Sequence, residues 1–168
     1  EIGEWDRFQI MLTGAPPIAV DDQLYLYYRG TSRRHAKVRR EFDPRIEIDQ
    51  DVSTMSIGLA TLRLDGFASI AGSYDVGHVM TRPFICHGNE LALNAKADHG
   101  HLRVELLTET EQSVEGYGID DCVAVCEDGV DLRVGWGPEG NRRLPDQPVR
   151  LRFELTNARL YSYWCAGH

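Results

Sequence analysis

Val149-Arg-Leu-Arg-Phe-Glu-Leu155 alternates apolar and charged residues without interruption. Side chains of a β-strand point to opposite faces in turn, so this pattern predicts a strand with one buried face and one wet face. His101-Leu-Arg-Val-Glu-Leu106 repeats the alternation, with its apolar residues at the even positions. Such strands predict antiparallel sheets, because the strands of parallel sheets are covered on both faces and are apolar throughout.

The same strand signal recurs along most of the chain. Gln23-Leu-Tyr-Leu-Tyr-Tyr-Arg29 is rich in strand-forming aromatics, and residues 56–64 form a second long run. Further strands are expected at residues 78–86, 90–97, 101–107, 121–126, 130–136, 148–155 and 159–164, separated by turns rich in Gly, Asp and Asn. Residues 33–42 are the one helix candidate and are equally well read as a loop. The predicted fold is therefore all-β, with an antiparallel β-sandwich of jelly-roll or concanavalin A-like type.

A domain boundary is predicted near residues 43–56. Residues 1–55 hold one hairpin-like unit and a loop with several acidic residues, and residues 56–168 hold a continuous series of strands. We therefore expect a hairpin with a connecting loop over 1–55 and the sandwich over 56–168.

The composition is that of an ordinary globular domain: 168 residues, 42% hydrophobic and 26% charged. No apolar run approaches the roughly 20 residues of a membrane-spanning helix. The net charge of −8 argues against nucleic acid and anionic membranes as partners. The sequence begins at Glu1 and shows no signal peptide, so we expect a processed start or a piece of a longer protein.

The basic charge gathers in residues 29–45, which hold seven basic and two acidic residues. A solvated loop of an acidic protein is the preferred interpretation. An interaction module that docks an acidic partner through this basic loop is the alternative, and its binding would weaken with salt.

The four cysteines, Cys86, Cys122, Cys126 and Cys165, are too few for a disulfide-dense mini-domain. Cys122 and Cys126 lie four residues apart in an expected strand, about 13 Å from each other, and cannot pair there. Buried structural cysteines are the preferred interpretation, and one long-range disulfide is the main alternative.

No sequence motif marks a catalytic or metal centre. His99 and His101 form a possible metal pair, but His99 lies in an expected turn without a third ligand, so we predict solvated histidines and no metal site. Asp120 and Asp121 are expected to hydrogen-bond a turn backbone or to help bind a structural calcium ion. No cofactor is predicted.

Aromatic side chains are the residues best suited to contact a sugar, because flat rings stack on the apolar faces of pyranose and furanose rings. In the last strand, Tyr161 and Tyr163 are expected on one face, and Trp164 on the other with Leu160. Trp5 and Trp136 are preferred as ligand contacts because loop residues flank them.

Two stretches resemble the late part of a five-bladed β-propeller glycoside hydrolase of family 32 or 43. Gly14-Ala-Pro-Pro-Ile-Ala-Val-Asp-Asp-Gln-Leu-Tyr-Leu-Tyr-Tyr-Arg-Gly30, followed by Arg33-Arg-His35, looks like a late blade. Ile57-Gly-Leu-Ala-Thr-Leu-Arg-Leu-Asp-Gly-Phe-Ala-Ser69 resembles the last propeller strand and its exit. The pieces from Thr81-Arg-Pro83 to Asn157-Ala-Arg-Leu-Tyr-Ser162 are similar to the C-terminal sandwich of that family.

The resemblance implies a propeller-blade-like hairpin followed by a β-sandwich, without the catalytic centre. Family members carry two catalytic Asp residues and an acid Glu on earlier blades, and no residue of this sequence matches them. A single blade does not close a propeller, because its sheet needs neighbours on both sides.

We therefore expect a non-catalytic, carbohydrate-associated β-sandwich that binds an oligo- or polysaccharide or supports an upstream catalytic propeller, in an extracellular or periplasmic setting. The alternative is a glycan-acting hydrolase in which Asp120 or Asp121 converges with Glu105 or Glu154. The predicted carbohydrate contacts are Trp5, Arg29, Arg33, His35, Tyr117 and Trp136.

Overall fold

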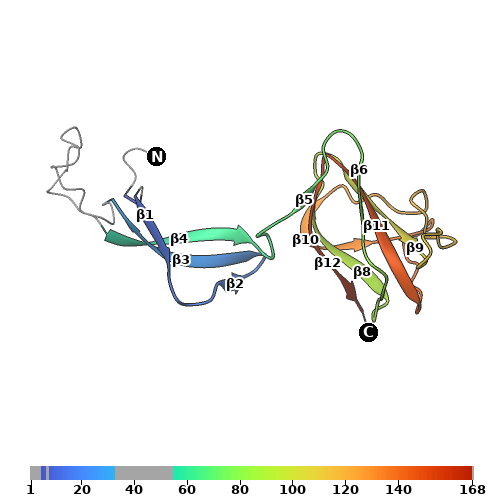
Figure 1. Ribbon diagram of the computed structural model, residues 1–168, viewed down its shortest axis with the longest axis horizontal. Coiled ribbons are helices and arrows are strands. Elements are labelled where there is room, and N and C mark those ends of the chain that lie inside the picture. The colour runs from blue at the N-terminus through green and yellow to red at the C-terminus, as the bar shows by residue number, and fades with distance from the viewer. Residues whose placement is uncertain (1–4, 7, 33–54, 168) are drawn as a thin grey trace. The chain divides into compact units, whose positions relative to one another are not determined.

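The computed structural model describes residues 5–6, 8–32 and 55–167, which form antiparallel strands joined by turns (Figure 1). The predicted all-β class is confirmed. The chain divides into two compact units, Glu1–Leu64 and Asp65–His168. Among the described residues there is no helix with the length and apolar character needed to cross a membrane.

The first unit is an antiparallel sheet built around β3 (Gln23–Thr31). β4 (Met55–Arg63) pairs with β3 along its full length. β1 (Gln9–Leu12) pairs with the second half of β3, and β2 (Ile18–Val20) pairs with its first half. The sequence pattern missed β1 and β2, because strands of four and three residues are too short to show alternation.

The pairing of β4 places the division of the chain later than the pattern indicated. Residues 56–64 were expected at the start of the sandwich, whereas the compact units divide between Leu64 and Asp65. The reason is the register, in which Gln23 lies opposite Arg63 and Thr31 lies opposite Met55. Backbone hydrogen bonding along nine residues thus holds this strand to the tyrosine-rich strand before it.

The second unit has two sheets that form a sandwich, as predicted (Figure 1). One sheet has the order β10-β8-β12-β5 and consists of Asp128–Val134, Glu90–Lys96, Arg159–Ala166 and Ile70–Ala71. In the other sheet, β11 (Pro148–Thr156) pairs with β9 (His101–Leu107) along one edge. β6 (Gly77–Met80) and β7 (Phe84–Ile85) follow one another along the other edge of β11.

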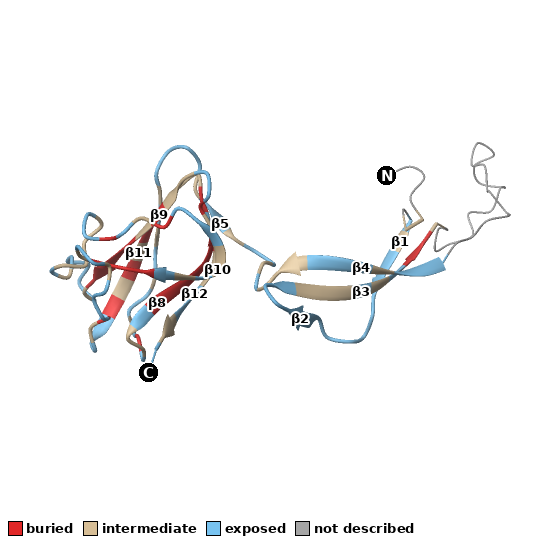
Figure 2. Cartoon of the chain, turned by 180° about the vertical axis from the view of Figure 1, so that it is seen from behind, coloured by how far each residue is buried: buried red, intermediate tan, exposed pale blue. Residues whose placement is uncertain are grey.

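The core lies between these two sheets, where Figure 2 shows the buried residues gathered. Val149, Leu151, Phe153 and Leu155 of β11 are at most 1% exposed, which confirms the predicted alternation. The largest fully buried side chains also include Trp136, Leu91, Leu93, Leu102, Leu106 and Val104. Burial of this apolar surface from both sheets is the main stabilising contribution to the unit.

Two of the expected strands, 78–86 and 121–126, do not form as predicted, and each has a local cause. The run 78–86 is divided into β6 and β7 at Pro83, which has no N–H to donate to a ladder. Residues 121–126 form no strand and make isolated bridges instead, Cys122 to Trp136 and Val125 to Leu102. This segment therefore bridges Trp136, which follows β10 of one sheet, and Leu102 in β9 of the other sheet.

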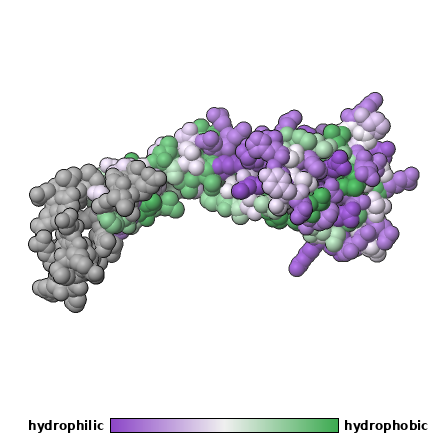
Figure 3. Space-filling view, turned by 90° about the horizontal axis from the view of Figure 1, so that it is seen from above, coloured by the Kyte–Doolittle hydropathy of each residue, from purple (hydrophilic) through white to green (hydrophobic). Residues whose placement is uncertain are grey.

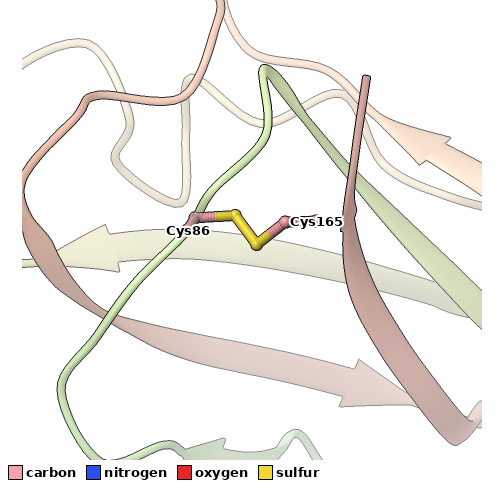
Figure 4. The surroundings of a disulfide bond; sticks show 2 residues. All are labelled: Cys86 and Cys165. Atoms are coloured by element: carbon pink, nitrogen blue, oxygen red, sulfur yellow. A yellow bond between two sulfur atoms is a disulfide. The ribbon is translucent and has the colours of Figure 1, made fainter. Parts of the chain in front are cut away.

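The preferred interpretation, four buried structural cysteines without a disulfide, is wrong for three of the four. Cys86 and Cys165 form a disulfide with their Cα atoms 5.7 Å apart, which is the long-range bridge kept as the alternative (Figure 4). The disulfide ties the loop before β8 to the end of β12. Cys122 is buried and Cys126 is exposed, and both carry free thiols.

Candidate functional site

The six predicted carbohydrate contacts do not form one site in either unit. Trp5 and Arg29 belong to the first unit, and Tyr117 and Trp136 belong to the second. Arg33 and His35 lie outside the described residues.

Trp5 packs over Tyr28 and Gly30 on one face of the first sheet. Its ring stacks on Tyr28 with a centroid separation of 5.8 Å and an interplanar angle of 12°. The Tyr28 hydroxyl donates a hydrogen bond to Asp6 Oδ2 at 2.7 Å, and this bond raises the pKa of Tyr28 above its usual value. A Cβ on Gly30 would lie 2.4 Å from Trp5 and Asp6 atoms, so glycine is needed for this close approach.

Arg29 lies on the opposite face of that sheet. Successive residues of a strand point to opposite sides, so Arg29 faces away from Tyr28 and its stacked partner. The Arg29 guanidinium donates a weak hydrogen bond to Met11 Sδ at 3.5 Å. Trp5 and Arg29 therefore cannot hold the same sugar ring between them.

Trp136 belongs to the core of the sandwich and is 1% exposed. Its Nε1–H donates a hydrogen bond to the Val104 carbonyl at 2.8 Å. The Tyr117 ring meets Trp136 edge-on at 5.6 Å, and the Tyr117 hydroxyl donates to the Arg143 carbonyl. Trp136 therefore has no free ring face for a sugar. The sequence suggested a loop position because Gly135 and Gly137 flank this buried residue.

Two of the four carboxylates of the hydrolase alternative, Glu105 and Glu154, lie opposite arginines in the β9–β11 pair. Glu105 is 5% exposed and makes an ion pair with Arg152, its cross-strand neighbour. Glu154 lies opposite Arg103 in the same register. Opposite charges at facing positions stabilise an antiparallel pair, which accounts for this pattern without catalysis.

Asp121 has the turn role that the sequence predicted. Its Oδ2 accepts a hydrogen bond from the Gly118 N–H at 3.1 Å. Within residues 5–6, 8–32 and 55–167, no three His, Cys, Asp or Glu side chains lie close enough together to hold a metal ion. A calcium site that includes Asp120 or Asp121 stays a prediction.

The outer face of the β10-β8-β12 sheet combines an exposed aromatic ring with charged groups. Arg133, Ala92 and Trp164 face one another across the three strands. They point outward, because Leu91 and Leu93 on either side of Ala92 lie in the core. We call this set the Trp164 face: Glu90, Ala92 and Asn94 of β8, Asp131 and Arg133 of β10, and Trp164 of β12.

A bulge in β12 creates the Trp164 face. Leu160 and Trp164 were expected on the same side of the strand, but the register shifts between Leu160 and Ser162. As a result Leu160 is buried, and the ring centroids of Tyr163 and Phe153 lie 5.3 Å apart. Trp164 lies on the outer face with 36% of its surface exposed. A one-residue irregularity moves every later side chain to the other face, and alternation alone does not reveal where it occurs.

A cavity of about 440 Å³ adjoins this face at Arg133. It is lined by residues 123–127, 132–133, 135 and 138–140. Its lining residues include Cys126, which is exposed and carries a free thiol, as well as Glu127 and Glu139.

The two free thiols are expected to differ in reactivity. Burial raises the pKa of the Cys122 thiol, and its sulfur accepts a hydrogen bond from the Val104 N–H at 3.2 Å. Because the thiolate is the reactive form, dithionitrobenzoate at pH 8 should titrate Cys126 rapidly and Cys122 only after unfolding. The Cys126→Ser variant should show no fast phase, and a fast phase that persists in it would contradict this assignment.

The comparisons with known proteins found no match. The searches covered family models, curated proteins and solved structures, and none of these matched the chain.

Proposed function

We propose that this chain is a non-catalytic accessory module of a larger, glycoside hydrolase-like β-protein. The first unit packs against a sheet of an upstream catalytic propeller, and the sandwich is the carbohydrate-associated part. The proposed setting is extracellular or periplasmic.

The observation that carries this proposal is the apolar face of the first unit. The strand registers place seven large hydrophobic side chains on one side of the sheet, around Arg29, and each of the seven is between 39% and 76% exposed. Figure 3 shows hydrophobic side chains gathered on the visible part of this unit, whereas hydrophilic ones predominate on the sandwich. These residues are Met11, Ile18, Val20, Tyr27, Met55, Ile57 and Leu59.

An exposed face of this kind is unfavourable in water. Each Å² of apolar surface left exposed forgoes about 25 cal/mol of burial free energy. A sheet reaches a stable arrangement when its apolar face packs on a second layer, and the blades of a propeller pack face to face in this way. The proposed occupant is therefore another β-sheet of the same protein, such as a neighbouring blade.

The second unit needs no such partner for its own stability. It encloses its own core between two sheets and is cross-linked by the Cys86–Cys165 disulfide. An incomplete sheet followed along the chain by a self-contained sandwich is the organisation expected of an accessory end. The disulfide also supports the proposed location, because such bonds persist mainly in oxidising compartments.

The size of the native protein tests the proposal. An antibody against this chain should detect, in an extract of the source cells and their medium, a protein much larger than 19.0 kDa. The purified 19.0 kDa chain on the same blot is the size control. A native band at the size of the control would contradict the proposal, because no upstream propeller would then be attached.

A further inference from the structure

The Trp164 face has an unusual distribution of side-chain size. Two of the outward positions of β8 hold Ala92 and Asn94, which are 0% and 1% exposed although they do not point into the core. Neighbouring atoms therefore cover both small side chains. The face has a floor of small residues between Arg133 on one side and Trp164 on the other.

Trp164 keeps about a third of its surface in contact with solvent, 36%. A Trp side chain is among the largest sources of burial free energy, so leaving it exposed sacrifices stability. Its Cα atom stands two strand spacings, about 10 Å, from that of Arg133, with Ala92 between them. The ring therefore offers an apolar surface next to a charged group on the same face.

Hydrogen bonds hold the polar side of this face in place. Arg133 Nη1 donates to Glu90 Oε2 at 3.0 Å, and Arg133 Nη2 donates to Asp131 Oδ2 at 3.2 Å. All three side chains are about half exposed. Each therefore presents donors or acceptors to solvent while its geometry is limited by its partner.

We propose that the Trp164 face binds a neutral sugar residue. Trp164 stacks on the apolar face of the ring, Arg133 donates to a hydroxyl oxygen, and Glu90 and Asp131 accept from hydroxyl groups. The face carries one guanidinium and two carboxylates, so its net charge is negative and would repel an acidic sugar. The cavity that adjoins Arg133 gives a longer oligosaccharide further surface.

This inference rests on the carbohydrate association in the proposed function and is tested with the whole chain by isothermal titration calorimetry. The probes are hexasaccharides of β-1,4-linked glucose, β-1,4-linked xylose and β-2,1-linked fructose, with a galacturonate hexasaccharide as the acidic probe. We expect at least one neutral probe to bind more tightly than the acidic one. Trp164→Ala should weaken that binding by about tenfold or more, equivalent to 1.4 kcal/mol.

Matched variants distinguish the loss of a sugar contact from a general loss of folding. Trp164→Phe retains a stacking ring and should bind more tightly than Trp164→Ala, and Arg133→Ala should weaken binding with the ring intact. Tyr74→Ala removes an aromatic ring that is 85% exposed elsewhere on the unit and should bind like the unchanged protein.

Three results would overturn the inference: no neutral probe binds, Trp164→Ala binds as tightly as the unchanged chain, or the galacturonate probe binds best. The second result would leave carbohydrate association intact and place it at another site. Attachment to a propeller is decided separately by the native mass, so the two proposals can fail independently.

Discussion

Replacing Cys86 with serine is expected to lower the free energy of unfolding of the sandwich by about 4 kcal/mol. The Cys86–Cys165 bridge spans 79 residues, most of the second unit. In the chain-entropy view, a cross-link over so long a loop removes many conformations from the unfolded state and so raises its free energy. Urea denaturation followed by far-ultraviolet circular dichroism, with and without a reductant, measures the difference.

The free thiol of Cys126 supplies the control for this experiment. Cys126→Ser changes an exposed cysteine without a disulfide and should leave the urea midpoint unchanged. Reductant should lower the midpoint of the unchanged chain and have little effect on Cys86→Ser. Equal midpoints for the reduced and oxidised chains would show that the bridge does not stabilise the sandwich.

Trp136→Ala is expected to lower the free energy of unfolding by about 3–5 kcal/mol. The substitution leaves a large cavity between the sheets, because Trp136 is 1% exposed. It also removes the donor to the Val104 carbonyl, which stays buried without that partner. Urea denaturation again gives the magnitude.

Trp164→Ala is the matched control for this second prediction. It removes the same side chain from the outer face, where 36% of its surface is exposed, and should cost much less stability. A Trp136→Ala chain as stable as Trp164→Ala would contradict the core position of Trp136 and reopen its role as a sugar contact.

Much of the sandwich could be predicted from local patterns. β8, β9, β10, β11 and β12 all lie within about two residues of the expected runs, because each has an apolar face that the core requires. The strands that were missed, β1, β2 and β5, have two to four residues and few buried side chains. Their pairing is imposed by longer neighbours instead of by their own sequence.

The candidate sugar site could not be predicted in the same way. Flanking loop residues favoured Trp136 as a ligand contact, and no local feature favoured Trp164 in the same way. In the structure Trp136 is buried and Trp164 is exposed. The bulge between Leu160 and Ser162 reverses which side of β12 each aromatic takes. The partners of Trp164 come from strands about 30 and 70 residues earlier in the chain, and no spacing rule connects them.

The sequence by itself determined the all-β class, the antiparallel pairing and the inward residues of β9 and β11, because hydrophobic periodicity is a local property that burial must satisfy. The tertiary structure alone decided the disulfide partners, the place of β4 beside β3, and the face on which Trp164 lies. These features depend on which distant segments meet and in what register. Since that choice is made by the free energy of the whole packed chain, no single segment contains it.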